Sequence, residues 1–182
     1  MAAAANERTR ARMERRQAAL AARSHMSPSG PAPDHFRVAT WNVMGSPTRA
    51  TVRTTGWRSR HGILAGDMNV APTDSDIFHP DAFVGLTHVT VPEREAWAHL
   101  LATGLVDVDA ARWGAHERRF TWWNHGLNYS RNLGMRIDMI AADPELARRV
   151  VTTWIDHVER GAERPSDHAA LLADFDLAPH GQ

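Results

Sequence analysis

The sequence predicts a mixed α/β (α+β) protein in which short strands and short helices build a layered sheet. Apolar segments of strand length recur between residues 36 and 177, and one central segment has helical spacing with helix-end signals. Polar or Gly/Pro-rich stretches separate these segments, as expected for alternating elements. A chain of 182 residues can bury one core, so we expect a single domain.

The first two strands are predicted at residues 36–43 and 62–67. "FRVATWNV" alternates enough for a half-buried strand, and "GILAGD" is an apolar run that ends at Asp67. Residues 44–60 between them have no clear period and are rich in Thr, Arg and Gly. We interpret this stretch as a loop at the junction of two regions.

The strongest helical signal lies in residues 90–104, "TVPEREAWAHLLATG". Thr90 and Glu93 have the spacing of a capping box, and Gly104 suits the C-terminal end of the helix. The apolar face of this helix would consist of Trp97, Leu100 and Leu101.

Four further strands are predicted in the second half of the chain. They are the short apolar or β-rich segments 119–123, 135–142, 150–157 and 169–175. "DPELARR", residues 143–149, predicts one or two helical turns between two of these strands.

The two ends of the chain differ from the predicted domain at residues 36–177. Residues 1–35 form an Arg/Ala-rich tail, disordered or helical, followed by a Pro/Ser/Gly linker, and residues 178–182 form a short tail. Residues 1–66 carry eleven Arg and three acidic residues, whereas residues 67–182 carry ten Arg and eighteen acidic residues. Such asymmetry is typical of nucleic-acid contact or of a basic tail.

The composition excludes several classes of protein. The chain has no Cys, which excludes disulfides and thiolate metal sites and favours a hard cation such as Mg²⁺ or Mn²⁺. No apolar run approaches the length of a membrane span, and the basic N-terminus lacks the apolar core of a signal peptide. We therefore expect no membrane partner and a cytoplasmic location, in the bacterial cytoplasm or nucleoid.

Asp67 and Asn69 are the first candidate functional residues. Alternate residues at a strand end point to one side, so this pair could orient a water or an oxyanion. Asn69 could also hold a phosphate oxygen without adding negative charge. An Asx-turn leading into Pro72 explains the same residues, and the pattern alone does not choose between the two.

A second group consists of acidic residues and a histidine near the C-terminus. Asp138 lies inside an apolar segment and needs a partner, which could be a histidine held in one tautomer or Arg136. Asp167 and His168 combine a carboxylate with an imidazole for proton transfer, with a helix cap or surface histidine as the alternative.

An aromatic, Arg-bearing segment follows residue 118. Trp122 and Trp123 are both candidates for the core, but one exposed Trp near basic residues could stack on a nucleotide.

These segments, in this order, resemble the exonuclease III and abasic-site endonuclease branch of the endonuclease/exonuclease/phosphatase family. "GDMNVAPTDSD" is similar to the family segment Gly-Asp-x-Asn-Ile-Ala-Pro-Thr-Asp, and "WNV" resembles the first strand. "FTWW", "NLGMRID" and "ERPSDHAALLADF" resemble the later signatures, so the match runs almost continuously from Gly62 to Phe175.

The resemblance implies a truncated four-layer α/β sandwich that hydrolyses phosphodiester bonds in duplex DNA, at 3′ ends or abasic sites, during DNA repair. It implies that Asp67 positions or deprotonates the attacking water and that Asn69 holds the phosphate. His168, oriented by Asp138, would stabilise the transition state.

The resemblance also implies a Mg²⁺ or Mn²⁺ ion and a DNA-binding surface. Asn42 and Asp167 would help to hold the metal. The implied DNA contacts are Trp122, Asn124, Asn132 and Arg136.

The sequence departs from the family pattern between Asn42 and Asp67. The family has a long additional region here, which supplies a metal-binding Glu and a catalytic Tyr, but residues 36–66 contain no acidic residue. The only Tyr is Tyr129, and Leu133 replaces a family Arg. A shortened sheet would expose an apolar face, so we expect self-association through that face.

Three functional hypotheses follow from these observations. The first is an active DNA phosphodiesterase. The second is an inactive truncated remnant, or a fragment that binds DNA or a partner without turnover. The third, a phosphatase for small phosphate esters, is disfavoured by the "VAPTD" segment.

Overall fold

The computed structural model describes residues 35–40, 42, 62–114, 117–124, 128–158, 160 and 166–176. The predicted loop at 44–60, the tail at 178–182 and all of the predicted tail at 1–35 except its last residue lie outside the described residues. The elements are β1 (His35–Thr40), β2 (Ile63–Asp67), η1 (Asp74–Asp76), η2 (Pro80–Phe83), α2 (Val91–Leu101), β3 (Val106–Asp107), α3 (Val108–Trp113), β4 (Asp138–Ala142), α4 (Pro144–Ala147), β5 (Val150–Asp156) and β6 (Ala170–Asp176).

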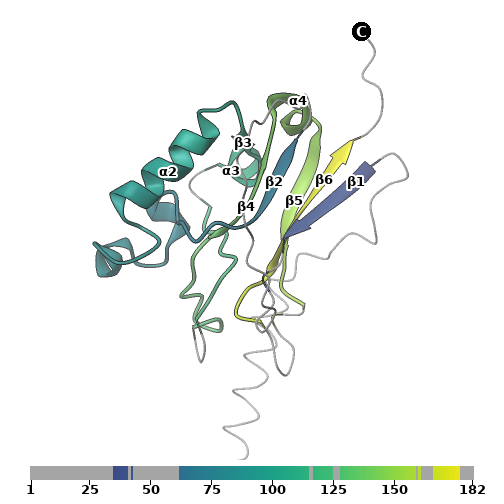
Figure 1. The fold of residues 1–182 in the computed structure, drawn as a ribbon. Helices are drawn as coiled ribbons and strands as arrows, with labels where there is room; N and C mark the ends of the chain where they lie inside the picture. The colour runs from purple at the N-terminus through teal and green to yellow at the C-terminus, as the bar shows by residue number, and fades with distance from the viewer. Residues whose placement is uncertain are drawn as a thin grey trace, which may run out of the picture.

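Two antiparallel three-stranded sheets form the centre of the described structure (Figure 1). One sheet has the strand order β1-β6-β5 and the other has the order β2-β4-β3. Helix α2 lies on the face of the second sheet that points away from the first sheet. The described residues thus build helix, sheet and sheet layers, which confirms the mixed α/β class.

The alternation of side chains along β4 joins these layers. Met139 and Ala141 pack on Trp97 of α2, whereas Ile140 and Ala142 point to the opposite face of the sheet. Because both faces of β4 are covered, all five of its residues are buried.

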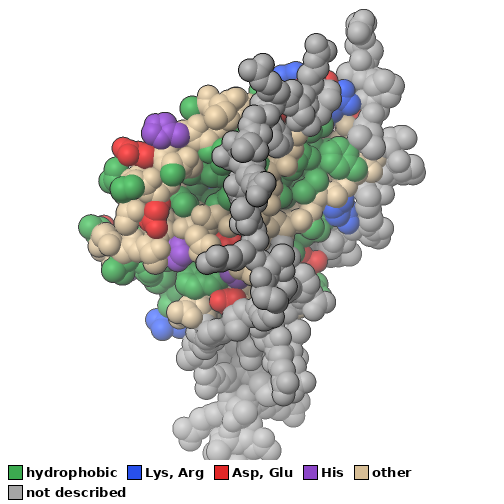
Figure 2. All heavy atoms as spheres, in the orientation of Figure 1, with side chains coloured by type: hydrophobic (Ala, Val, Ile, Leu, Met, Phe, Trp, Pro, Cys, Tyr) green, Lys and Arg blue, Asp and Glu red, His purple; other side chains and the backbone are tan. Residues whose placement is uncertain are grey.

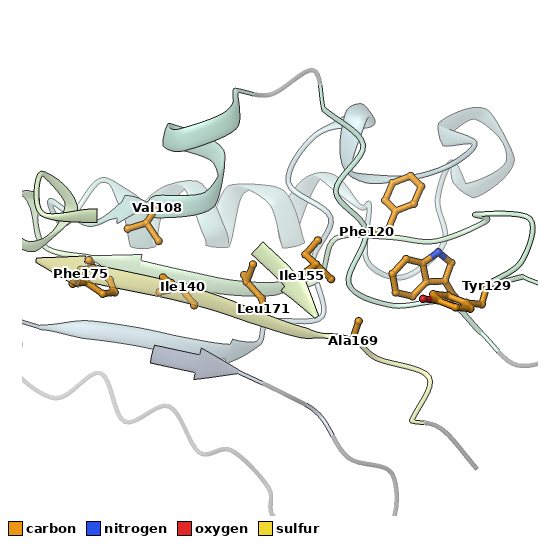
Figure 3. Close-up of a cluster of buried hydrophobic side chains, with 11 residues drawn as sticks. Val108, Phe120, Tyr129, Ile140, Ile155, Ala169, Leu171 and Phe175 are labelled. Atoms are coloured by element: carbon orange, nitrogen blue, oxygen red, sulfur yellow. The ribbon is translucent and has the colours of Figure 1, made fainter. Parts of the chain in front are cut away.

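Figure 3 shows the apolar cluster that the two sheets share. Ile140 from β4 meets Leu171 and Phe175 from β6, and Val108 of α3 closes the cluster. Phe36 of β1 stacks on Phe175 with ring centroids 4.8 Å apart. The core therefore fixes β6, and with it the residues that precede β6, against β4.

The predicted helix at residues 90–104 is confirmed as α2, which is followed by a turn to Gly104 at φ 107°. The hydroxyl of Thr90 donates to the Glu93 carboxylate over 2.6 Å, and the Thr90 amide donates over 2.9 Å. These hydrogen bonds lower the pKa of Glu93 to about 2, and the hydroxyl of Thr90 has a larger effect than its amide. The capping box read from the sequence is therefore present.

The predicted strand at residues 119–123 is wrong. Trp122 makes only isolated bridges, to Met135 and to His168. The strand predicted at 135–142 begins at Asp138, because the hydroxyl of Thr121 accepts the amides of residues 137 and 138, both at 3.1 Å. A side chain thus replaces the backbone partner that a longer strand would need.

Two further features concern surfaces. Among the helices of the described part of the chain, none is both long and apolar enough to cross a bilayer. The large exposed apolar side chains of the described residues are Val84, Leu86, Val91, Val151 and Val158. Only Val151 lies in a strand, and self-association through a sheet face stays a prediction.

Candidate active site

The register between β2 and β4 places two carboxylates opposite each other. Asp67 and Asp138 are direct partners at the end of the antiparallel pair, so their side chains lie on one face. Like charges in this position repel, and His168 lies between them. Its Nδ1 is 2.8 Å from Asp138 Oδ2, and its Nε2 is 3.8 Å from Asp67 Oδ2.

The backbone around His168 is held by neighbours from distant parts of the chain. The His168 amide donates to the Ser166 hydroxyl over 3.1 Å, and that hydroxyl donates to the carbonyl of Asn42. The Ala169 amide donates to the carbonyl of Thr121 over 2.7 Å. These bonds fix the imidazole at the entry to β6.

Burial and pairing decide the charge of the Asp138–His168 pair. Asp138 is 0% exposed and accepts from His168, so Nδ1 of the ring carries a hydrogen. Burial opposes the imidazolium, but the hydrogen bond and charge of Asp138 outweigh it and raise the pKa of His168. Burial also raises the pKa of Asp138, against the opposing effect of His168. The pair therefore holds its proton to a higher pH than an isolated histidine does.

Asn69 reaches the site by a turn rather than along a strand. β2 ends at Asp67, and Asn69 has φ 53°, so the expectation that both lie on one face of a strand is wrong. The Asn69 amide donates to Asp67 Oδ1 over 2.9 Å, which is the Asx-turn that the sequence allowed. The turn still places the exposed Asn69 beside Asp67.

Asn42 lies on the other side of the same carboxylate. Its Nδ2 donates to Asp67 Oδ2 over 3.0 Å and is 3.4 Å from His168 Nε2. Asp67, Asp138, His168 and Asn42 are therefore brought together, although they come from four separate segments.

Trp122 and Asp167 lie next to this group. The indole Nε1 of Trp122 donates to Asp167 Oδ2 over 2.9 Å, and Trp122 is half-buried. Trp123 instead is 1% exposed and packs edge-on against Tyr129 with centroids 4.9 Å apart. One Trp of the pair thus belongs to the core, and the other lies beside the site.

The residues expected to contact DNA differ in exposure and in their hydrogen-bond partners. Asn124 is exposed, but the Asn132 carboxamide oxygen accepts the indole hydrogen of Trp123 over 3.1 Å. The expectation that Arg136 contacts DNA is wrong, because Arg136 is 5% exposed and its guanidinium donates to Asp76 and Asp107. This pairing also removes Arg136 as the partner of Asp138.

The residues suggested as metal ligands provide only part of a metal-binding site. The carboxamide of Asn42 and the carboxylate of Asp167 are ligand types that Mg²⁺ accepts. Within the described ranges, however, no group of three or more His, Asp or Glu side chains is arranged to hold a metal ion. The described residues therefore supply suitable oxygen ligands without completing a coordination shell.

Figure 2 shows several acidic and His side chains on one face of the molecule, among apolar and uncharged ones. A separate cavity of about 220 Å³ lies between α2 and α3, lined by Trp97, Asp107 and Arg119 among others. None of the residues around Asp67 lines this cavity.

Comparison with known families identifies the architecture. The model of the endonuclease/exonuclease/phosphatase family matches residues 11–168 of this chain. The chain belongs to this family. Individual relatives are similar to part of the chain.

Two curated relatives of the endonuclease/exonuclease/phosphatase family are bacterial nucleases. Exodeoxyribonuclease III of Haemophilus influenzae is 33% identical over 120 residues, covering 62% of this chain and 45% of the relative. Exodeoxyribonuclease of Bacillus subtilis is 32% identical over 110 residues, covering 60% of this chain and 42% of the relative. The chain thus spans less than half the length of these relatives.

Two solved structures are similar to about two thirds of this chain. The 3′ phosphatase NExo from Neisseria, bound to a product DNA hairpin, has a TM-score of 0.63 and 34% identity, covering 65% of this chain and 46% of that one. An AP endonuclease from Archaeoglobus fulgidus has a TM-score of 0.61 and 38% identity, covering 68% and 48%.

Three residues near the site were not singled out from the sequence. Thr121 and Ser166 act through hydroxyl contacts to distant backbone groups, which leave no local pattern. His88 contacts Asn69 with its ring, and a separation of 19 residues hides this contact from any motif. Their positions became visible only in the folded chain.

Proposed function

We propose that this chain hydrolyses phosphodiester bonds of duplex DNA, at 3′ ends or at abasic sites, in DNA repair. The observation that carries the proposal is the convergence of Asp67 and Asp138 on one imidazole, that of His168. Membership of the endonuclease/exonuclease/phosphatase family and the similarity to exodeoxyribonuclease III support it. A role on chromosomal DNA corresponds to a location in the bacterial cytoplasm or nucleoid.

In this proposal Asp67 acts on the attacking water. Each of its oxygens accepts a single hydrogen bond from a protein amide, from Asn69 or from Asn42, among the described residues. A carboxylate oxygen has more than one acceptor site, so a water can bind and transfer a proton to it. The exposed carboxamide of Asn69 then holds a phosphate oxygen beside this water.

His168 acts on the charge that develops at the phosphate. Its protonated ring is held by Asp138 on one side and lies near Asp67 on the other. A fixed cation in a partly dry site stabilises negative charge that grows in the transition state. Half-buried Trp122 and exposed Asn124 border the space for the sugar and bases.

A divalent ion, Mg²⁺ or Mn²⁺, forms a second part of the proposal. Asn42 and Asp167 would contribute ligands, and water or another segment must supply the rest. When bound, such an ion would neutralise charge on the phosphate.

We expect the chain to cut a duplex with one abasic site in the presence of Mg²⁺, and EDTA to abolish the cut. The measurement is a gel assay with an end-labelled abasic duplex, and the same duplex without the lesion reports 3′-end removal separately. Equal cutting with and without EDTA would contradict the metal requirement. No cutting under any metal condition would eliminate catalysis by this chain.

We expect Asp138→Asn to lower the pKa of His168, because the hydrogen bond to the carboxylate and the charge of Asp138, which raise it, are lost. In the wild type, the raised pKa of His168 stabilises the fold at pH values below the ordinary pKa of His, about 6.5. This stabilisation is lost as the pH rises through the higher pKa that His168 has in the folded protein. The variant should lose this stability, and its cleavage rate should decline at a lower pH.

NMR titration of the His168 ring, together with the pH profile of cleavage, checks this prediction. Asp81→Asn, which changes an exposed acid, is the control and should leave both unchanged. Identical His168 titrations in Asp138→Asn and wild type would show that the pairing does not set the charge.

Binding of DNA without turnover is a second candidate function. It is favoured by the lack, among the described residues, of a group of three or more His, Asp or Glu side chains arranged to hold a metal ion. Salt-sensitive binding of duplex DNA without any cleavage would support this candidate over the first.

A further inference from the structure

We propose that His88 is a positioning residue of the candidate active site and that it acts by fixing the backbone of Asn69. The ring Nδ1 of His88 lies 2.8 Å from the carbonyl oxygen of Asn69. The consequence for catalysis rests on the proposed function, whereas the contact itself can be tested without any activity.

His88 and Asn69 both have unusual backbone conformations. His88 has φ 76° and Asn69 has φ 53°, so both non-glycine residues lie in the left-handed region that L-residues seldom adopt. A second bond, from the Ala71 amide to the His88 carbonyl over 2.7 Å, ties the same two segments together. Residues held in such conformations persist only where the surroundings enforce them, and they gather at functional sites.

The contact also fixes the tautomer of the ring. A carbonyl oxygen can only accept, so Nδ1 of His88 must carry the hydrogen that lies between the two groups. This assignment follows from the geometry alone and gives the ring a definite spectroscopic signature.

The ring of His88 connects the two sides of the site. Its centroid is 6.1 Å from that of Trp122, whose indole donates to Asp167. On the other side, Asn69 donates its amide to Asp67. His88 thus contacts a residue of the Asp67 turn and a residue of the Trp122–Asp167 pair.

The expected role is to aim the Asn69 carboxamide at the substrate phosphate. If the His88 ring is removed, the Asn69 peptide can rotate and the carboxamide is no longer held in place. Small misplacements of a positioning group cost up to about 100-fold in rate. The loss should fall on kcat more than on KM, because many other groups bind the DNA.

The experiment compares two variants at this position. His88→Gly keeps the backbone, because Gly adopts φ 76° without strain, but removes the ring. His88→Asn tolerates the left-handed region and offers an amide hydrogen to the Asn69 carbonyl. His79→Gly, which changes an exposed histidine elsewhere, is the matched control.

The first readout is NMR of the full chain without DNA. We expect the Nδ1–H tautomer for His88 in the wild type, and in His88→Gly we expect shifted amide and carboxamide signals of Asn69. His88→Asn should restore these signals toward the wild-type positions. The Nε2–H tautomer, or Asn69 signals that do not change in His88→Gly, would overturn the proposal.

The second readout is cleavage of the abasic duplex. We expect kcat to fall about 10- to 100-fold in His88→Gly with a much smaller change in KM, and to recover in part in His88→Asn. Unchanged kcat in His88→Gly would overturn the positioning role. If the wild type cleaves nothing, the proposed function fails, while the NMR result still decides whether His88 fixes Asn69.

Discussion

Replacing Asp67 by Asn is expected to lower the rate of abasic-duplex cleavage by about 10²–10⁴-fold, the range that general acid–base catalysis contributes. The substitution keeps the shape of the side chain but removes the carboxylate that accepts the proton of water. DNA binding should be retained or strengthened, because a negative charge beside the phosphate is lost. Asp67 is also the group that His168 Nε2 faces, at 3.8 Å.

The measurement combines single-turnover cleavage with a binding assay on the same abasic duplex. Asp74→Asn is the control, since Asp74 is an exposed acid paired with Arg94 and lies outside the site. Cleavage by Asp67→Asn at the rate of the wild type would remove Asp67 from the chemistry. Tight binding by both proteins with cleavage by neither would favour the binding-only function.

Replacing Arg136 by Met is expected to destabilise the fold by about 3–5 kcal/mol, the cost of leaving buried charges without a partner. Arg136 Nε is 2.6 Å from Asp76 Oδ1, and Nη1 is 2.8 Å from Asp107 Oδ2. Burial lowers the pKa of Arg136, and the charges of Asp107 and Asp76 outweigh this and raise it. Without the guanidinium, two carboxylates would face each other in the interior.

The loss should extend to α3 and η1, the elements that these two carboxylates stabilise. Asp107 caps α3 by accepting the Ala110 amide over 3.2 Å, and Asp76 accepts the amide and hydroxyl of Thr73. Arg136 therefore fixes α3 and η1 to the segment that leads into β4.

Urea unfolding of the variants measures this effect. Arg94→Met, which breaks the more exposed pair with Asp74 and a hydrogen bond to the Ala71 carbonyl, should cost only about 1–2 kcal/mol. The combined variant R136M/D76N/D107N should regain part of the loss, because it removes the unpaired charges as well. Equal unfolding midpoints for Arg136→Met and Arg94→Met would refute the buried network as a stabilising unit.

Local signals in the sequence were sufficient for part of the fold. The capping box of Thr90 and Glu93 predicted the start of α2, since both partners lie within one helical turn. Asp138 in an apolar run correctly indicated a buried carboxylate. These predictions succeeded because the physical cause lies within a few residues of the effect.

Other predictions failed where the cause is distant in the chain. The strand at 119–123 was predicted from aromatic residues, but the Thr121 hydroxyl instead accepts the amides of Ile137 and Asp138 at the start of β4. The family resemblance implied that Arg136 contacts DNA, and nothing in the sequence indicates that Asp76 and Asp107 surround it. Of the two interpretations left open for Asn69, the strand is wrong, since β2 ends two residues earlier, and the Asx-turn is confirmed.

The sequence by itself determined the mixed α/β class and the helix α2, since periodicity and helix caps depend on neighbouring residues, and its family resemblance indicated which residues meet around Asp67. Only the tertiary structure decided that His168 lies between Asp67 and Asp138, that Arg136 is buried, and that His88 holds Asn69. The reason is physical. A buried polar group takes the partner that strand register and core packing bring within hydrogen-bond distance, and neither is set by residues close in sequence.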